Sequence, residues 1–230
     1  MELSEAIRVR HAVRHYTDKP IPQDIVDELQ KTIDRCNREG NLRMQLKLND
    51  PAAFEGFLTD YGIYKGARNL VAIVSDKTPD WEERCGYYGA HVLLRATQLG
   101  LDTGWVRQFG RHLSKHVALE SGERPRFAIV MGYGTNHGHQ HRSKRYDQVA
   151  RVPKGMGTPK WFCNGVEAAL LAPTSLNQQK FVFTLQPDGH TVEAKAGLGL
   201  CTHTDLGIAK YHFEIGAGPD ADFVWSRVEH

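Results

Sequence analysis

Apolar residues recur with the period of an α-helix along five stretches of the chain. The clearest stripe places Ile25, Leu29 and Ile33 on one face of a helix that follows two prolines. A longer helix should begin at residues 78–79, Thr-Pro, and end at Gly100, because proline suits a first turn and glycine a C-terminus. The other three helices are expected over residues 4–9, 161–171 and 204–215.

Six short runs have the composition or the alternation of β-strands. Residues 69–75 (NLVAIVS) and 127–132 (FAIVMG) are nearly continuous apolar runs, which is typical of strands buried on both faces. Helices and strands that mix without strict alternation favour an α+β fold. The other four runs lie at residues 44–48, 180–186, 191–196 and 222–228.

The composition changes between residues 133 and 157, where Gly, His, Lys and Arg replace the apolar periodicity. We interpret this stretch as a linker or an excursion from the fold. The order helix, asparagine, strand occurs both before and after it, around Asn41 and around Asn177. An amphipathic helix that follows a strand also occurs twice. These echoes indicate a doubled architecture.

The bulk composition excludes several classes of protein. Hydrophobic residues make up 40% of the 230 residues, and 29 basic against 27 acidic residues give a net charge of +2. This balance does not favour a nucleic-acid surface. No run approaches the roughly 18 apolar residues of a membrane span, and the N-terminus has no apolar signal region. The four cysteines form no CxxC pair, so we expect free thiols in the cytoplasm.

A polar loop follows the helix expected over residues 161–171. Pro173 disfavours the helical conformation of the residue before it, so the helix must end near Ala172. A loop between two rigid elements can present hydrogen-bonding groups to a polar, planar ligand, although an ordinary helix–strand connection uses the same residue types. The side chains that this loop displays are those of Thr174, Ser175, Asn177 and Gln179.

Two arginines near the N-terminus are candidate phosphate ligands. Arg10 and Arg14 are four residues apart, so on a helix or its last turn they would share a face. Two guanidinium groups that converge there would suit a phosphate, because their paired N–H groups match its oxygens. The alternative is a solvated basic face that includes Arg8.

The histidines at 137, 139 and 141 could suggest a metal site. They alternate within a glycine-containing stretch and no second ligand cluster with fixed spacing accompanies them, so we interpret the stretch as a polar loop without metal. Residues 142–145 (RSKR) could add charge to a phosphate site or keep the loop in water. The sequence has no GxSxG, Walker-type or HExxH motif.

Several of these pieces resemble motifs of the nitroreductase family. Residues 10–14 (RHAVR) resemble its Arg-Arg-Ser-x-Arg motif, and residues 172–179 (APTSLNQQ) resemble its Ala-Pro-Ser-x-x-Asn-x-Gln flavin loop. Residues 66–74 are similar to its central strand, and residues 99–105 (LGLDTGW) to its Leu-Gly-Leu-Gly-Thr-x-Trp segment. Residues 131–134 (MGYG) resemble its late Gly-Tyr strand. The resemblance implies a mainly antiparallel sheet flanked by helices.

The order of the motifs departs from the usual family pattern. In ordinary members the flavin loop follows the arginine motif closely, and each flavin lies between two subunits. Here the expected place holds residues 40–43 (GNLR), and the better copy begins only at Pro173. The chain therefore resembles an internally duplicated branch, a pseudo-dimer in one compact unit with one surviving flavin site. We expect a first half over residues 1–135, a linker over 136–157 and a second half over 158–230.

The resemblance implies roles for residues on both sides of the site. Arg10 and Arg14 should reach the FMN phosphate or the N1–O2 edge of the flavin ring, where a cation stabilises the reduced form. The motif serine is Ala12 in this chain, which removes one phosphate donor. The residues expected to bind FMN are Arg10, His11, Ala12, Arg14, Gly104, Trp105, Val106, Arg107, Lys144, Arg145, Pro173, Thr174, Ser175, Asn177 and Gln179.

The parts of the flavin that these residues should meet differ. Thr174, Ser175 and Asn177 should contact the ribityl hydroxyls or the pyrimidine edge, supported by Gln179. Backbone groups of residues 104–107 should approach N5. Lys144 and Arg145 should add to the phosphate clamp.

The resemblance implies an FMN-dependent oxidoreductase without a dedicated acid–base pair. A reduced nicotinamide, NADH or NADPH, would give hydride to the flavin, which would then reduce a nitroaromatic, a quinone or a similar acceptor. The alternative is a flavin-binding protein with little or specialised turnover. We expect no nucleic-acid or membrane partner, and a monomer or a homodimer.

Overall fold

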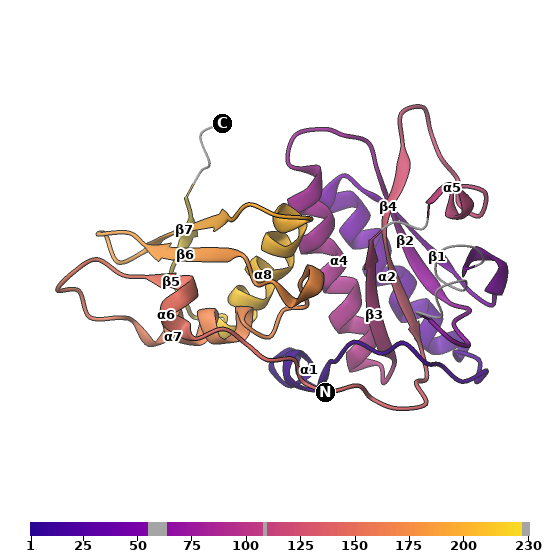
Figure 1. Ribbon diagram of the computed structural model, residues 1–230, viewed down its shortest axis with the longest axis horizontal. Helices are drawn as coiled ribbons and strands as arrows, with labels where there is room; N and C mark the ends of the chain where they lie inside the picture. The colour runs from indigo at the N-terminus through magenta and orange to yellow at the C-terminus, as the bar shows by residue number, and fades with distance from the viewer. Residues whose placement is uncertain (55–63, 108–109, 227–230) are drawn as a thin grey trace.

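The first sheet is built from four antiparallel strands in the order β1-β2-β4-β3 (Figure 1). The computed structural model describes residues 1–54, 64–107 and 110–226. Every residue of the central strand β2 is buried, which accounts for its continuous apolar sequence. The strands are β1 (Arg43–Lys47), β2 (Leu70–Ser75), β3 (Asp102–Arg107) and β4 (Arg124–Gly132).

Two layers cover this sheet. Val71 and Ile73 of β2 point to the face that packs on α2 (Gln23–Gly40) and α4 (Trp81–Gln98). The alternate residues of β2 point to the opposite face. There they meet the chain segment after α1 (Leu3–Val9), together with η1 (Pro51–Phe54) and α5 (Gly110–Leu113).

A second, smaller sheet lies on the other side of α4, in the order β5-β6-β7-β8 (Figure 1). Its middle pair is antiparallel and its two outer pairs are parallel. An aromatic core of Phe162, Phe183 and Phe213 joins it to the helices. The elements are α6 (Tyr146–Val149), β5 (Ala150–Arg151), α7 (Lys160–Ala169), η2 (Ser175–Asn177), β6 (Phe181–Leu185), β7 (Thr191–Ala196), α8 (Thr202–Ala217) and β8 (Val224–Trp225).

Helices α4 and α8 form the junction between the two parts, and glycines let them cross closely. A Cβ atom on Gly86 would collide with the carbonyl oxygen of Thr204, and one on Gly207 would collide with that of Glu83. Each glycine thus contacts the residue three positions before the other glycine. Two related halves packed about a two-fold axis would produce this reciprocity. The internal duplication itself stays a prediction.

The α+β class and the mainly antiparallel first sheet confirm the expectation, and the predicted helices and strands occur with ends shifted by a few residues. Residues 227–228 of the last expected strand lie outside the described residues. Two details differ. The first helix begins at Leu3, one residue before the expected start, with Glu2 as its N-cap. The stretch expected as a linker contributes α6 and β5, and β5 pairs with β6. In the described ranges no helix is both long and apolar enough to cross a membrane.

Candidate functional site

A cavity of about 680 Å³ lies between the segment after α1 and the polar loop before β6. It is large enough for a cofactor-sized ligand. Its wall contains basic and imidazole side chains, and no carboxylate lines it among the described residues. The lining residues are Arg10, His11, Ala12, Arg14, His15, Asn136, Gly138, His139, His141, Pro173, Thr174, Leu176 and Asn177.

The segment that carries the two arginines is extended, because α1 ends at Val9. The backbone N–H of Val13 donates to the carbonyl oxygen of Thr103 at 2.9 Å, and Ala12 forms an isolated bridge with the same residue of β3. Arg10 and Arg14 therefore line one cavity through the two-residue period of an extended chain. The expectation that they share a helical face was wrong.

Arg10 is a buried cation that has no counter-ion among the residues that the structure describes. It is 5% exposed, and its Nε atom has no hydrogen-bond partner. Burial lowers the pKa of its guanidinium to about 10. A charged group so placed costs stability unless an anion pairs with it. An anion at this point would compensate the charge of Arg10.

His212 of α8 lies behind Arg10 and is fully buried. Its Nδ1 donates to the carbonyl oxygen of Ile208 at 2.9 Å, which leaves Nε2 as an acceptor without a partner. Burial, together with the charge of Arg10, lowers the pKa of His212 to about 3. The imidazole stays neutral at ordinary pH and adds no second positive charge beside Arg10.

Asp205 of α8 fixes the polar loop through hydrogen bonds. Both carboxylate oxygens accept the backbone N–H of Ser175, at 3.0 and 3.1 Å, and Oδ2 also accepts Nε2 of Gln178 at 2.8 Å. Burial raises the pKa of Asp205 to about 6. These bonds hold a strained backbone, since Leu176 and Asn177 both have φ of +52°. Asp205 was not among the residues expected at the site, and it lies in the first turn of α8.

Residues 142–144, from the stretch expected as a linker, hold the same loop through further hydrogen bonds. Asn177 Nδ2 and Gln179 Nε2 both donate to the carbonyl oxygen of Arg142, at 2.8 and 3.0 Å. The backbone N–H of Lys144 donates to Gln179 Oε1 at 2.8 Å, and its Nζ donates to the Gln179 carbonyl oxygen at 2.9 Å. Gln179 is buried behind the loop, where it holds Lys144 and Asn177 together.

Some of the predicted residues lie outside the cavity wall. Gly104 and Val106 of β3 are buried, and the Trp105 ring packs at 6.0 Å from that of Phe127. Arg107 is exposed at the end of the strand. The N5 role of this segment stays a prediction.

The two basic residues predicted for the phosphate clamp also lie outside the wall. Arg145 is exposed and pairs with Asp147 at 2.8 Å, while Lys144 is bonded to Gln179. Their clamp role likewise stays a prediction. Of the expected set, the cavity brings together Arg10, His11, Ala12, Arg14, Pro173, Thr174 and Asn177.

The histidines of the polar loop separate into two groups. His139 and His141 line the cavity. His137 bonds through Nδ1 to Asp102 at 3.0 Å, and this carboxylate raises the pKa of His137. Within residues 1–54, 64–107 and 110–226, no three His, Cys, Asp or Glu side chains gather as a metal site.

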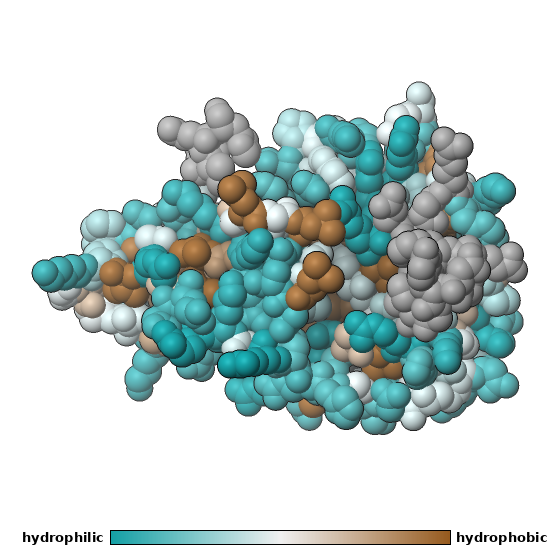
Figure 2. All heavy atoms as spheres, viewed as in Figure 1, coloured by the Kyte–Doolittle hydropathy of each residue, from teal (hydrophilic) through white to brown (hydrophobic). Residues whose placement is uncertain are grey.

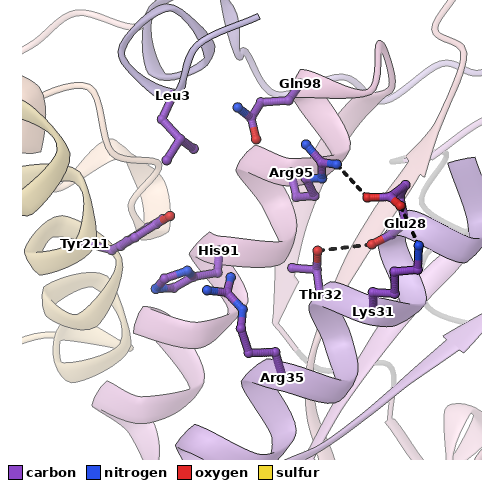
Figure 3. A pocket seen from close by; sticks show the side chains of 9 residues that line it. All are labelled: Leu3, Glu28, Lys31, Thr32, Arg35, His91, Arg95, Gln98 and Tyr211. Atoms are coloured by element: carbon purple, nitrogen blue, oxygen red, sulfur yellow. Dashed lines mark hydrogen bonds and ion pairs between the residues drawn. The ribbon is translucent and has the colours of Figure 1, made fainter.

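A second hollow of about 360 Å³ lies between α2, α4 and α8 (Figure 3). Glu28 there binds both Lys31 and Arg95 at 2.8 Å, so these charges satisfy one another. The His91 ring stacks on Tyr211 with centroids 3.6 Å apart. None of the predicted site residues lines this hollow, so the larger cavity is the candidate site.

The raised pKa of the buried Asp205 predicts how the stability of the protein depends on pH. Because its pKa is raised from 3.8 to about 6, the folded protein holds the proton more tightly than the unfolded chain. Stability should fall by up to about 3 kcal/mol as pH rises from 4 to 7. Asp205→Asn should lack this loss. The free energy of unfolding of the variant, measured in urea, should therefore rise relative to that of wild type as the pH rises. Parallel pH profiles would contradict the assignment.

The exposed Asp188 offers a control of opposite sign. Hydrogen bonds from Thr191 lower the pKa of Asp188 to about 2. Its stabilising effect is present above the unfolded pKa and is lost as the pH falls through about 2. The free energy of unfolding of Asp188→Asn should therefore be lower than that of wild type above pH 4.

The comparisons with known proteins agree with this architecture. Residues 2–217 match the family described as "Putative TM nitroreductase". A structure described as a putative nitroreductase from Thermotoga maritima is 20% identical, covers 93% of this chain and 82% of its own, and has a TM-score of 0.64. No curated protein matches the chain.

Two other similar structures cover less of the chain. A putative nitroreductase in complex with FMN from Desulfovibrio desulfuricans is 19% identical, with a TM-score of 0.53 over 65% of this chain and 95% of its own. A putative NADH dehydrogenase/NAD(P)H nitroreductase from Parabacteroides distasonis is 18% identical, with a TM-score of 0.52 over 65% of this chain and 97% of its own. These identities establish the fold alone. Because the family match spans almost the whole sequence, the chain belongs to this nitroreductase family.

Proposed function

We propose that the protein is an FMN-dependent oxidoreductase that uses NADH or NADPH to reduce a nitroaromatic, a quinone or a similar acceptor. The observation that carries the proposal is the buried guanidinium of Arg10, whose Nε has no partner, in a cavity that no carboxylate of the described residues lines. The FMN complex and the NAD(P)H nitroreductase among the similar structures support the same chemistry.

The cavity residues fit the chemical parts of FMN. Arg10 and Arg14 would pair with the phosphate or with the electron-rich edge of the ring. Thr174 and Asn177 offer a hydroxyl and an amide to ribityl or pyrimidine groups. When bound, FMN supplies hydride chemistry that no side chain provides. The protein would hold the ring, orient two successive ligands and balance negative charge, while NAD(P)H, a proton and a quinone give NAD(P)⁺ and a hydroquinone.

We also propose that one flavin binds per chain. In the register set by Gly86 and Gly207, Arg84 of α4 corresponds to Asp205 of α8, since each lies two residues earlier. Arg84 donates to the carbonyl oxygen of Gly40 at 3.3 Å. Asp205 makes the corresponding contact in the second half, where it accepts the backbone N–H of Ser175. The Tyr88 ring leaves no room for a side chain at Gly40. Protein groups therefore occupy the loop at residues 40–43 of the first half. This supports the proposal that no second flavin binds there.

The setting we propose is the cytoplasm. Cys36, Cys85, Cys163 and Cys201 are free thiols. Free thiols persist where glutathione and thioredoxin keep cysteines reduced.

Anaerobic addition of NADH or NADPH to the FMN-loaded protein tests the function. Bleaching of the flavin absorbance within seconds, followed by its return when menadione is added, would support the oxidoreductase. A bound flavin that neither nucleotide bleaches would favour the alternative, a flavin-binding protein with little turnover. The two nucleotides added separately would also reveal the preferred donor.

A further inference from the structure

Imidazole side chains share the wall of the candidate site with guanidinium groups. His11 and His15 come from the segment after α1, and His139 and His141 come from the stretch between β4 and α6. Gly138 lets the two segments approach each other, since a Cβ atom there would lie 3.0 Å from the Cβ atom of His11. Histidine is the side chain that gains or loses charge near neutral pH, so the charge of this wall can change with what it binds.

His11 is the half-buried imidazole that follows Arg10 directly in the chain. Both residues also line a smaller hollow of about 250 Å³, so they border two spaces. Burial lowers the pKa of His11, and the charges of Arg10, His141 and His139 lower it further. His11 is therefore neutral at pH 7 in the flavin-free protein, because protonation would add a second charge beside Arg10.

The charged and titratable groups around His11 are nearly all basic in the described part of the chain. Asp102, which borders the smaller hollow, accepts Nδ1 of His137 at 3.0 Å and the backbone N–H of Gly134 at 2.8 Å. These bonds occupy the Asp102 carboxylate, so a bound anion is the group that could hold a proton on His11. By element, the groups are Arg10, Arg14 and His15 of the same segment, Met1 at the N-terminus, Asp102 of β3, His137, His139 and His141 before α6, and His212 of α8.

A phosphate ester in the cavity would reverse this balance. It carries about 1.5 to 2 negative charges at pH 7, and an opposite charge within about 6 Å favours the protonated imidazole. His11 would then donate a charge-assisted hydrogen bond beside the guanidinium of Arg10. Solvent can supply the proton, because Figure 2 shows a mostly hydrophilic lower edge where Figure 1 places the chain after α1 and the stretch after β4.

We propose that His11 takes up a proton when FMN binds. The protein then binds FMN more tightly as the pH falls from 8 to 6.5, and it prefers FMN to riboflavin, which lacks the phosphate, most strongly at the lower pH. Because the binding of the proton and of the phosphate are linked, each strengthens the other by the same factor. This inference rests on the proposed function for the identity of the ligand.

Isothermal titration calorimetry of the flavin-free protein tests the proposal without turnover. At pH 7.5, titrations with FMN in buffers of different ionisation enthalpy, HEPES and Tris, should show uptake of about 0.5 to 1 proton per FMN. Between pH 8 and 6.5 the Kd of FMN should fall about tenfold, whereas that of riboflavin should change less than about twofold. Riboflavin should take up no proton, because it brings no anion to His11.

His11→Gln assigns the proton to its residue. The variant should take up no proton, and its Kd for FMN should change less than about twofold over the same pH range. His203→Gln, at an exposed histidine of α8 outside the cavity wall, is the matched control and should keep the wild-type pH dependence.

The outcomes separate this inference from the proposed function. Proton uptake that persists in His11→Gln, or that riboflavin equals, would overturn the inference. FMN that binds without proton uptake and is bleached by a nucleotide would refute the inference alone. FMN that binds with proton uptake but that neither NADH nor NADPH bleaches would refute the oxidoreductase and keep the proton-linked site. A protein that binds no FMN at either pH would refute both.

Discussion

Replacing Arg10 with methionine should weaken FMN binding by at least about 100-fold and at the same time stabilise the flavin-free protein. The two effects have one cause. Arg10 is 5% exposed with its Nε unpaired, and the neighbouring His212 stays neutral, so no group in the described part of the chain compensates the charge of Arg10. A buried cation of this kind costs stability in the absence of an anion, and the anion recovers that cost when it binds. Methionine fills a similar volume without charge.

We expect the flavin-free Arg10→Met protein to gain about 2 kcal/mol in its free energy of unfolding. Urea denaturation followed by circular dichroism would measure this gain, and fluorescence titration with FMN would measure the affinity. Arg8→Ala, at an exposed arginine of α1, is the matched control and should change neither quantity by much. A variant that loses stability while it binds FMN as wild type does would mean that Arg10 is a structural residue.

Replacing Gly86 with alanine should cost about 3 kcal/mol or more of folding stability. The added methyl group would collide with the backbone oxygen of Thr204, and a backbone atom at a helix crossing has little freedom to move. Gly207→Ala should cost a similar amount, because it meets the Glu83 oxygen in the same way. The two parts of the molecule meet at this crossing, so both variants should also weaken a site that takes residues from both parts.

Thermal or urea unfolding of the two variants would test this expectation. Gly157→Ala is the matched control, since that glycine is exposed and has open space around its Cβ position. It should stay within about 0.5 kcal/mol of wild type. Stable Gly86→Ala and Gly207→Ala proteins with unchanged cooperativity would contradict the close α4–α8 packing.

The hydrophobic pattern predicted the elements well because it reflects local geometry. The period of the stripe through Leu29 and Ile33 identifies α2, and the apolar run of β2 identifies a central strand. The crossing of α4 on α8 depends on two glycines that are distant in sequence. Glycines occur for many reasons, so nothing local distinguished Gly86 and Gly207 as contacts between helices.

The candidate site was predicted in part. The arginine motif and the flavin loop were identified by resemblance, and the fold places Arg10, Arg14, Thr174 and Asn177 around one cavity. The supporting residues were missed, because Asp205 and His212 act through tertiary contacts that no spacing reveals. The helical relation expected of the arginines was wrong, since α1 ends one residue before Arg10.

The flavin content of the purified protein tests the central claim most directly. FMN released by denaturation should amount to about one molecule per chain after loading, with the absorbance of a flavoprotein before release. Arg10→Met, prepared in the same way, should be colourless. A wild-type protein that takes up no added FMN, or one that holds two per chain, would contradict a single flavin site assembled from the arginine segment and the distant polar loop.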